Sequence, residues 1–185
     1  MQALLFLILA LGFSPDGRPR EGEGQPSPPK RIHYVEPEFP AAARQVSPPL
    51  QGIVILKMTL NEQGQPVDIT VLRPMPLLDQ AAVDAARQWR YEATTVNGVP
   101  ARVIVQEVVD VFPDHETRAR YWADMLGKTK LERPFRLLAA ERLGLMGLRK
   151  RYVFEALRKA STDRDPDIRA AAARALEALG DPNGM

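Results

Sequence analysis

The side chains that most often carry enzyme chemistry are few in this chain. His33 and His115 are the two histidines among the 185 residues, and there is no cysteine. Both histidines lie at predicted domain edges, isolated from each other. A catalytic group or a metal ion is normally held by several partner side chains. The histidines therefore indicate neither a metal site nor a catalytic triad.

One cluster of carboxylates deserves a test as a metal site. Asp163, Asp165 and Asp167 repeat the alternating acids that open a calcium-binding loop. Such a loop requires glycine at its sixth position and a bidentate glutamate at its twelfth. Those positions hold Ile168 and Arg174, so the pattern fails. The sequence also lacks a glycine-rich phosphate loop, and we expect a protein without catalytic, cofactor or metal residues, which is not an enzyme.

The composition excludes further classes of protein. With 45% hydrophobic residues the chain can bury a core, and with no cysteine it has neither disulfides nor cysteine-bound zinc. The formal charge is +2, from 25 basic and 23 acidic residues. This near balance gives no support to a nucleic-acid partner.

The elements that would position a binding surface begin with a predicted hairpin. Residues 52–60 are rich in β-branched and aliphatic side chains, and residues 65–73 alternate between apolar and polar ones. The polar turn 61–64 between them carries a glycine suited to a positive φ. We expect two antiparallel strands.

A helix and a third strand follow the hairpin. Residues 78–91 place Leu78, Ala81, Ala82, Ala85 and Trp89 on one stripe, which is typical of an amphipathic helix lying on a sheet. Asp79, at the helix start, is interpreted as a cap and not as an acid catalyst. Residues 101–112 form the third strand. The fold class is therefore α+β, a small antiparallel three-stranded sheet with one packed helix in the order β-β-α-β.

From residue 114 onward the pattern becomes helical. The predicted helices span about 116–128, 134–146, 149–161 and 166–179. The segment 138–144 returns 36 residues later as 174–180, and such a period is typical of helical solenoids. Asp165-Pro166 followed by Ile168-Arg169 resembles the turns of HEAT-type repeats. A small helical bundle with fortuitous similarity is the alternative.

Several short motifs occur in a fixed order between residues 31 and 113. They are Pro37-Glu38-Phe39-Pro40, Ala43-Arg44, Gly52, Gly64, Leu78-Asp79, Ala81-Ala82, Trp89-Arg90-Tyr91-Glu92, Asn97-Gly98, Pro100 and Phe112. Together they resemble the C-terminal domain of the TonB family. The chain departs from the family pattern in having Phe39 for a tyrosine, Ala93 for a proline, and the added Ser47-Pro48-Pro49.

The resemblance implies a binding mode. In this family the last strand lies at a sheet edge and pairs with an extended peptide segment of an outer-membrane transporter, which satisfies the unpaired N–H and C=O groups of that edge. The residues expected to bind the partner are Glu36, Phe39, Arg102, Val103, Ile104, Val105, Gln106, Glu107, Val108 and Val109. The alternative is that the valines are only core and that the helical tail covers the edge.

The N-terminus bears on localisation. Residues 3–13 form an apolar run too short to span a bilayer, which takes roughly 20 residues. The segment 1–13 that contains this run is interpreted as a signal peptide, as a truncated membrane anchor, or as an apolar N-terminus of no consequence. Residues 14–30 form a proline- and glycine-rich linker that reaches about 50 Å when extended. The domain at 31–113 and the helical region at 114–185 would then lie in the periplasm.

Two functions remain open at this point. In the first, the chain is a TonB-like module that binds transporters, supports energy-dependent transport across the outer membrane, and contacts inner-membrane motor proteins. In the second, it is an exported adaptor or scaffold that keeps the fold without energy transduction and uses the HEAT-like tail as an interaction surface. The partner of that tail is unknown.

Overall fold

The computed structural model describes residues 9–10, 29–96 and 98–181. The chain divides into two compact units, one ending at Val111 and the other beginning at Phe112. Most of the apolar run predicted at residues 3–13, and the linker predicted at 14–30 up to residue 28, lie outside the described residues. No helix within the described ranges is both long and apolar enough to cross a membrane.

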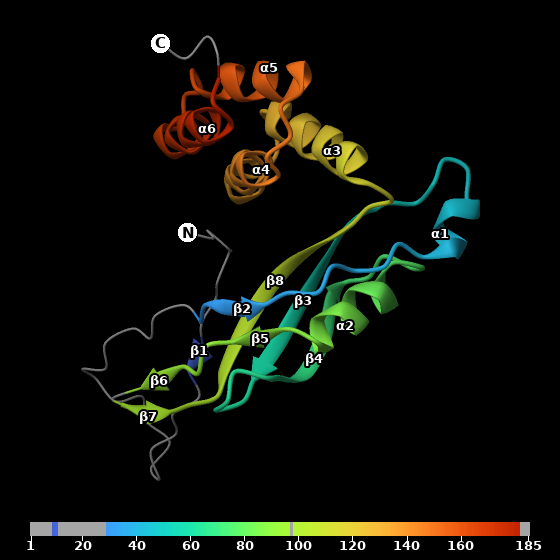
Figure 1. Ribbon diagram of the computed structural model, residues 1–185, viewed down its shortest axis with the longest axis vertical. Coiled ribbons are helices and arrows are strands. Elements are labelled where there is room, and N and C mark those ends of the chain that lie inside the picture. Colours follow the sequence, from blue (N-terminus) through green and yellow to red (C-terminus); the bar gives the residue numbers. More distant parts are fainter. Residues whose placement is uncertain (1–8, 11–28, 97, 182–185) are drawn as a thin grey trace. The chain divides into compact units, whose positions relative to one another are not determined.

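The first unit is built on an antiparallel sheet (Figure 1). The predicted hairpin is confirmed as β3 (Gly52–Leu60) and β4 (Pro66–Arg73). Its turn is closed by the Asn61 side chain, which accepts from the backbone N–H groups of Gln63 and Gln65. Gly64 in this turn has a φ of 73°, which favours glycine. The predicted third strand is β8 (Val103–Val111), which pairs with β3 along its whole length.

The sheet has one strand more than the sequence predicted. Its order is β1-β8-β3-β4, where β1 (Leu9–Ala10) comes from the N-terminal apolar run. All neighbouring strands are antiparallel, so β3 lies in the centre and β8 lies between β3 and β1. The expectation of three strands therefore lacks β1, which lies at the β8 edge where the sequence predicts peptide binding.

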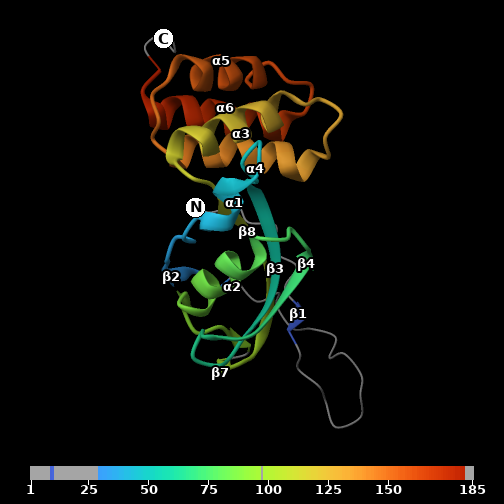
Figure 2. The ribbon, with the colours of Figure 1, turned by 90° about the vertical axis from the view of Figure 1, so that its right-hand side faces the viewer.

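The helix α2 (Asp79–Arg87) lies across one face of this sheet (Figures 1 and 2). It buries the predicted alanines Ala82 and Ala85 against the strands. The core also contains Phe39, Val54, Leu56, Met58, Leu60, Leu78, Ala86, Trp89, Tyr91, Val103, Val105, Val109 and Val111. The prediction that Asp79 caps the helix is wrong, because Leu78 holds the N-cap position and no side-chain cap hydrogen bond is made there. Asp79 is the first residue of α2, and its carboxylate accepts from the backbone N–H of Met75, which precedes the helix.

Several short elements were not predicted. The predicted helix 78–91 is too long at its C-terminal end, because Arg90–Tyr91 leaves it to form β5. This strand pairs with β2 (Arg31–His33) in a two-stranded ribbon. A second ribbon joins β6 (Thr95–Val96) to β7 (Val99–Pro100), and α1 (Ala41–Gln45) is a single short turn of helix.

Within its described residues the second unit consists of four helices, which confirms the predicted helical region. They are α3 (His115–Gly127), α4 (Arg133–Leu145), α5 (Arg151–Ala160) and α6 (Pro166–Leu179). They form two successive helix pairs, α3 with α4 and α5 with α6. The pairs stack so that α3 packs on α5 and α4 packs on α6. The predicted Asp165 cap is confirmed, since its carboxylate accepts from the N–H groups of Asp167 and Ile168 and Pro166 opens the helix.

Candidate peptide-binding edge

The side chains of β8 alternate between two faces of the sheet, as the period of a strand requires. Those on the α2 side are buried, and they are Val103, Val105, Glu107, Val109 and Val111. Ile104, Gln106 and Val108 lie on the opposite face and are half-buried. Four of the ten residues predicted to bind a peptide, namely Val103, Val105, Glu107 and Val109, are thus buried on this face. A partner would meet the backbone of these residues and not their side chains.

One long edge of β8 is paired with β3, and the other edge carries β1. Leu9 lies opposite Ile104, and Ala10 lies opposite Val103, in antiparallel register. An extended segment of the chain itself is therefore added to the edge at which the sequence predicted a guest strand. Sequence reasoning missed this pairing because the apolar run at residues 3–13 has the composition of a membrane-targeting segment. That composition suits a strand equally well.

A buried polar cluster fixes the middle of β8. The Glu107 side chain is 1% exposed, and its carboxylate accepts from the Tyr91 hydroxyl at 2.9 Å. The same carboxylate pairs with the Arg31 guanidinium at 3.4 Å, and the Arg31 side chain is itself only 8% exposed. Burial raises the pKa of the Tyr91 phenol well above its usual range; the Glu107 charge adds to this shift and Arg31 opposes it. The cluster joins β2, β5 and β8.

The Arg31 guanidinium also contacts two aromatic rings. It lies 4.5 Å from the ring centroid of Tyr34 and 4.6 Å from that of Trp89. The Trp89 indole N–H donates to the Val35 carbonyl at 2.8 Å, and the side chain is 1% exposed. Trp89 is thus the inward anchor that the sequence predicted. These contacts hold the segment 31–35 against the sheet next to β8.

The remaining predicted site residues are placed differently from one another. Glu36 is exposed, whereas Phe39 is buried in the core with the Arg44 guanidinium 5.1 Å from its ring centroid. Arg102 directly precedes β8 and pairs with Glu62 at 3.2 Å. Glu36 and Arg102 can meet a partner through their side chains. Phe39 can act only by shaping the surface above it.

The aspartates that resemble a calcium loop serve other purposes. Asp163 pairs with the nearly buried Arg136 at 2.5 Å, and Asp165 caps α6 and pairs with Arg133. The hydrogen bond from Arg136 lowers the pKa of the Asp163 carboxyl, and the backbone N–H of Asp165 adds to this shift. Among the described residues no group of three or more His, Cys, Asp or Glu side chains is arranged to hold a metal ion.

Comparison with known proteins matches the sheet unit and the helical unit to two different families. Residues 35–110 match the family described as Gram-negative bacterial TonB protein C-terminal, and residues 113–184 match the family of HEAT repeats. Two curated relatives, each named Protein TonB, come from Xanthomonas campestris pv. campestris strains B100 and ATCC 33913. Each is 39% identical over 67 residues, which is 35% of this chain and 29% of the relative.

The chain therefore spans less than a third of the length of these two relatives. The match falls on the unit that contains β8, and the helices α3 to α6 fall in the region that matches HEAT repeats. The sheet with its packed helix and the four-helix unit are the folds expected from the two resemblances. Residues 35–110 are thus similar to the C-terminal domain of TonB proteins, and residues 113–184 are similar to HEAT repeats.

Proposed function

We propose that the domain at residues 31–113 binds an extended peptide segment of outer-membrane transporters in the periplasm, and so supports energy-dependent transport across the outer membrane. The guest strand pairs with the backbone of β8. The observation that carries this proposal is the pairing of β1 with β8, because it is an instance of strand addition at that edge. The TonB match supports the class of partner.

Binding at this edge uses the backbone of β8, whose side chains hold the strand in place. The inward side chains of β8 are packed in the core, and Glu107 ties the strand to β2 and β5 through Arg31 and Tyr91. The guest therefore meets a strand that is already ordered, and ordering β8 adds no further cost to binding. Neither matched family is a family of enzymes, and the role proposed here is binding.

The guest strand competes with β1. Both use the β8 edge at Val103 and Ile104, so binding of the peptide there requires that β1 leave. A chain that lacks residues 1–28 should bind transporter peptides more tightly than the full chain. Leu9→Pro, which removes a backbone donor from β1, should act in the same direction. Equal affinities for all three proteins would refute competition at this edge.

Strand pairing itself is tested with methylated peptides. Fluorescent eight-residue peptides from the periplasmic segments of outer-membrane transporters are titrated with the full chain, and binding is followed by anisotropy. Methylation of single peptide nitrogens should weaken binding about tenfold at every second residue and have little effect between them, because alternate N–H groups face the partner strand. Loss of affinity without this alternation would contradict strand pairing.

A second candidate function is an exported adaptor that keeps the fold without energy transduction. The HEAT-repeat region favours it, because stacked helix pairs provide extended surfaces for other proteins. The two functions differ in membrane attachment. A mature protein released into the periplasm and found by intact mass to begin at Phe13 would favour the adaptor. A chain retained at the inner membrane would favour the transducer.

A further inference from the structure

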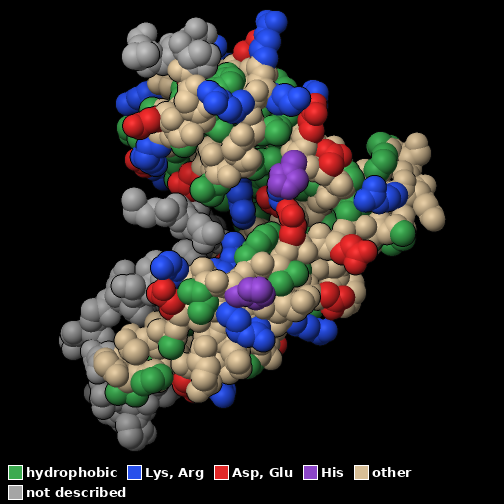
Figure 3. Space-filling model, viewed as in Figure 1, with side chains coloured by type: hydrophobic (Ala, Val, Ile, Leu, Met, Phe, Trp, Pro, Cys, Tyr) green, Lys and Arg blue, Asp and Glu red, His purple; other side chains and the backbone are tan. Residues whose placement is uncertain are grey.

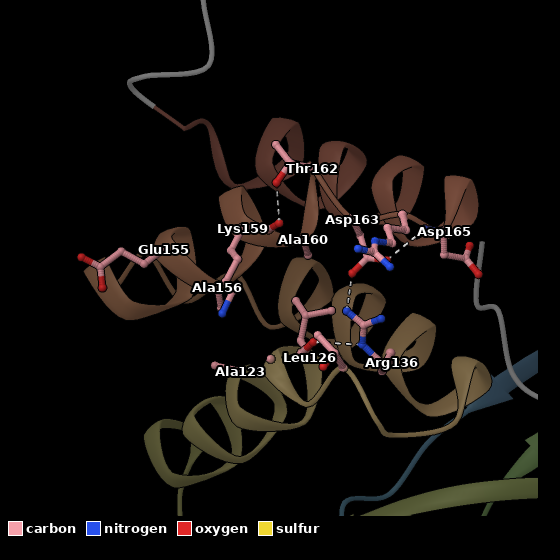
Figure 4. Close-up of a pocket in the computed structure, with 13 residues that line it drawn as sticks. Ala123, Leu126, Arg136, Glu155, Ala156, Lys159, Ala160, Thr162, Asp163 and Asp165 are labelled. Atoms are coloured by element: carbon pink, nitrogen blue, oxygen red, sulfur yellow. Dashed lines mark hydrogen bonds and ion pairs between the residues drawn. The ribbon is translucent and has the colours of Figure 1, made fainter.

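A cavity of about 940 Å³ lies in the helical unit, between α3 and α5. Figure 4 shows the residues around it, which come from these two helices, from α4, and from the α3–α4 and α5–α6 loops. The lining residues with apolar side chains are Ala123, Leu126, Ala156 and Ala160. Three of them are alanines, so the floor of the cavity is apolar and leaves room for the side chains of a ligand.

The acidic side chains around this cavity are already neutralised. Asp163 faces Arg136 at the centre of the view in Figure 4, and the two form an ion pair. Asp165 caps α6 and pairs with Arg133. Glu155 points away from the cavity and pairs with Arg151 at 2.7 Å.

Two cations on the rim are not neutralised. Lys159 and Arg164 are exposed, and the described residues provide no side-chain hydrogen bond or ion pair to either. In Figure 4 the Lys159 side chain extends from α5 toward α3, across the space of the cavity. The cavity thus combines an apolar floor with two unmatched positive charges.

We propose that this cavity, which we call the α3–α5 groove, is a docking site for an acidic peptide segment of a partner protein. Small or aliphatic side chains of the peptide pack on Leu126 and the neighbouring alanines. Two peptide carboxylates pair with Lys159 and Arg164. The inference is independent of the β8 edge and assigns a partner chemistry to the HEAT-repeat region.

The charge pattern favours a peptide over a nucleic acid. A polyphosphate backbone requires a continuous run of cations, whereas the lining of this groove offers two, because its third cation, Arg136, is paired with Asp163. On the face shown in Figure 3 the Lys and Arg side chains of the helical unit are interspersed with acidic and apolar ones. A peptide with two carboxylates flanking an apolar residue matches the two cations and the apolar floor better than a polyphosphate backbone does.

The test selects ligands without assuming a sequence. A display library of random twelve-residue peptides is panned on the full chain, and enriched peptides are synthesised and titrated by anisotropy. The groove variant carries Lys159→Glu with Arg164→Glu. The matched control carries Lys150→Glu with Lys130→Glu, the same change of charge at exposed positions that do not line the groove. Circular dichroism verifies that both variants keep the helical content of the parent.

We expect enriched peptides that carry at least two acidic residues next to an aliphatic one. Their affinity should fall about tenfold or more in the groove variant and stay within about twofold in the control. Peptides that bind the groove variant as tightly as the parent use another surface, such as the β8 edge. The groove is not an acidic-peptide site if every enriched peptide binds the groove variant as tightly as the parent. The same conclusion follows if no enriched peptide is acidic, or if no peptide is enriched.

Discussion

Removal of the Arg31 charge is the perturbation that best probes the base of the β8 edge. Arg31→Met keeps an unbranched apolar side chain of similar length and deletes the guanidinium. The Glu107 carboxylate, 1% exposed, then loses its ion pair with Arg31 and keeps the hydrogen bond from the Tyr91 hydroxyl. A buried charge that loses its counter-ion destabilises the folded state much more than the pair itself stabilises it.

The magnitude follows from the geometry. At the 3.4 Å separation of Arg31 and Glu107, the Coulomb attraction is about 5 kcal/mol at an effective dielectric of about 20. Desolvation of both groups cancels part of it, and the contacts of Arg31 with Tyr34 and Trp89 add about 1 kcal/mol. We expect Arg31→Met to lower the free energy of unfolding of this unit by about 3 kcal/mol.

The assay is urea unfolding followed by tryptophan emission. The chain has two tryptophans, so Trp122→Phe in the helical unit leaves Trp89 as the reporter of the sheet unit. The double variant Arg31→Met with Glu107→Gln removes both charges, and it should be more stable than Arg31→Met alone. A loss below about 1 kcal/mol for Arg31→Met, or additive losses in the double variant, would refute the charge-pair reasoning.

Three further predictions concern pH and close packing. Because Arg136 lowers the folded-state pKa of Asp163, the ionised Asp163 carboxylate stabilises the helical unit. This stabilisation is complete above the unfolded pKa of about 4 and is lost as pH falls through the folded pKa. Asp163→Asn should abolish this acid dependence in unfolding curves followed by circular dichroism. Gly64→Ala should destabilise the sheet unit by about 1–3 kcal/mol in urea, because its Cβ would overlap the Tyr91 carbonyl and φ is 73°. Gly144→Leu should destabilise the helical unit by about 2 kcal/mol and lower its thermal midpoint, because a Cβ at position 144 would lie 2.9 Å from the Cβ of Ala175 in α6. An unchanged thermal midpoint would show that α4 and α6 are not in contact there.

The sequence predicted the elements whose signals are local. The alternation in β4, the run of β-branched residues in β3 and the turn at Gly64 all depend on neighbours in the chain, and the structure has them where they were expected. The helix cap at Asp165 and the four helices of the second unit also depend on neighbours in the chain, and they too occur where they were expected. Hydrophobic periodicity and capping chemistry suffice for such features.

The features that were missed depend on distant residues. Arg90–Tyr91 continues a helical pattern, yet it becomes a strand because β2 is available to pair with it. Glu107 is a polar residue in an apolar strand, and its partner Arg31 lies 76 residues away. The pairing of β1 with β8 and the α3–α5 groove likewise arise from tertiary contacts, for which a single sequence carries no periodic signal.

Binding at the β8 edge is the central claim, and nuclear magnetic resonance of the labelled full chain tests it most directly. Titration with an unlabelled transporter-derived peptide should shift the backbone amides from Val103 to Val111, and should replace the cross-strand contacts of β1 with contacts between the peptide and β8. Binding that shifts amides elsewhere and leaves those of β8 unchanged would contradict the claim.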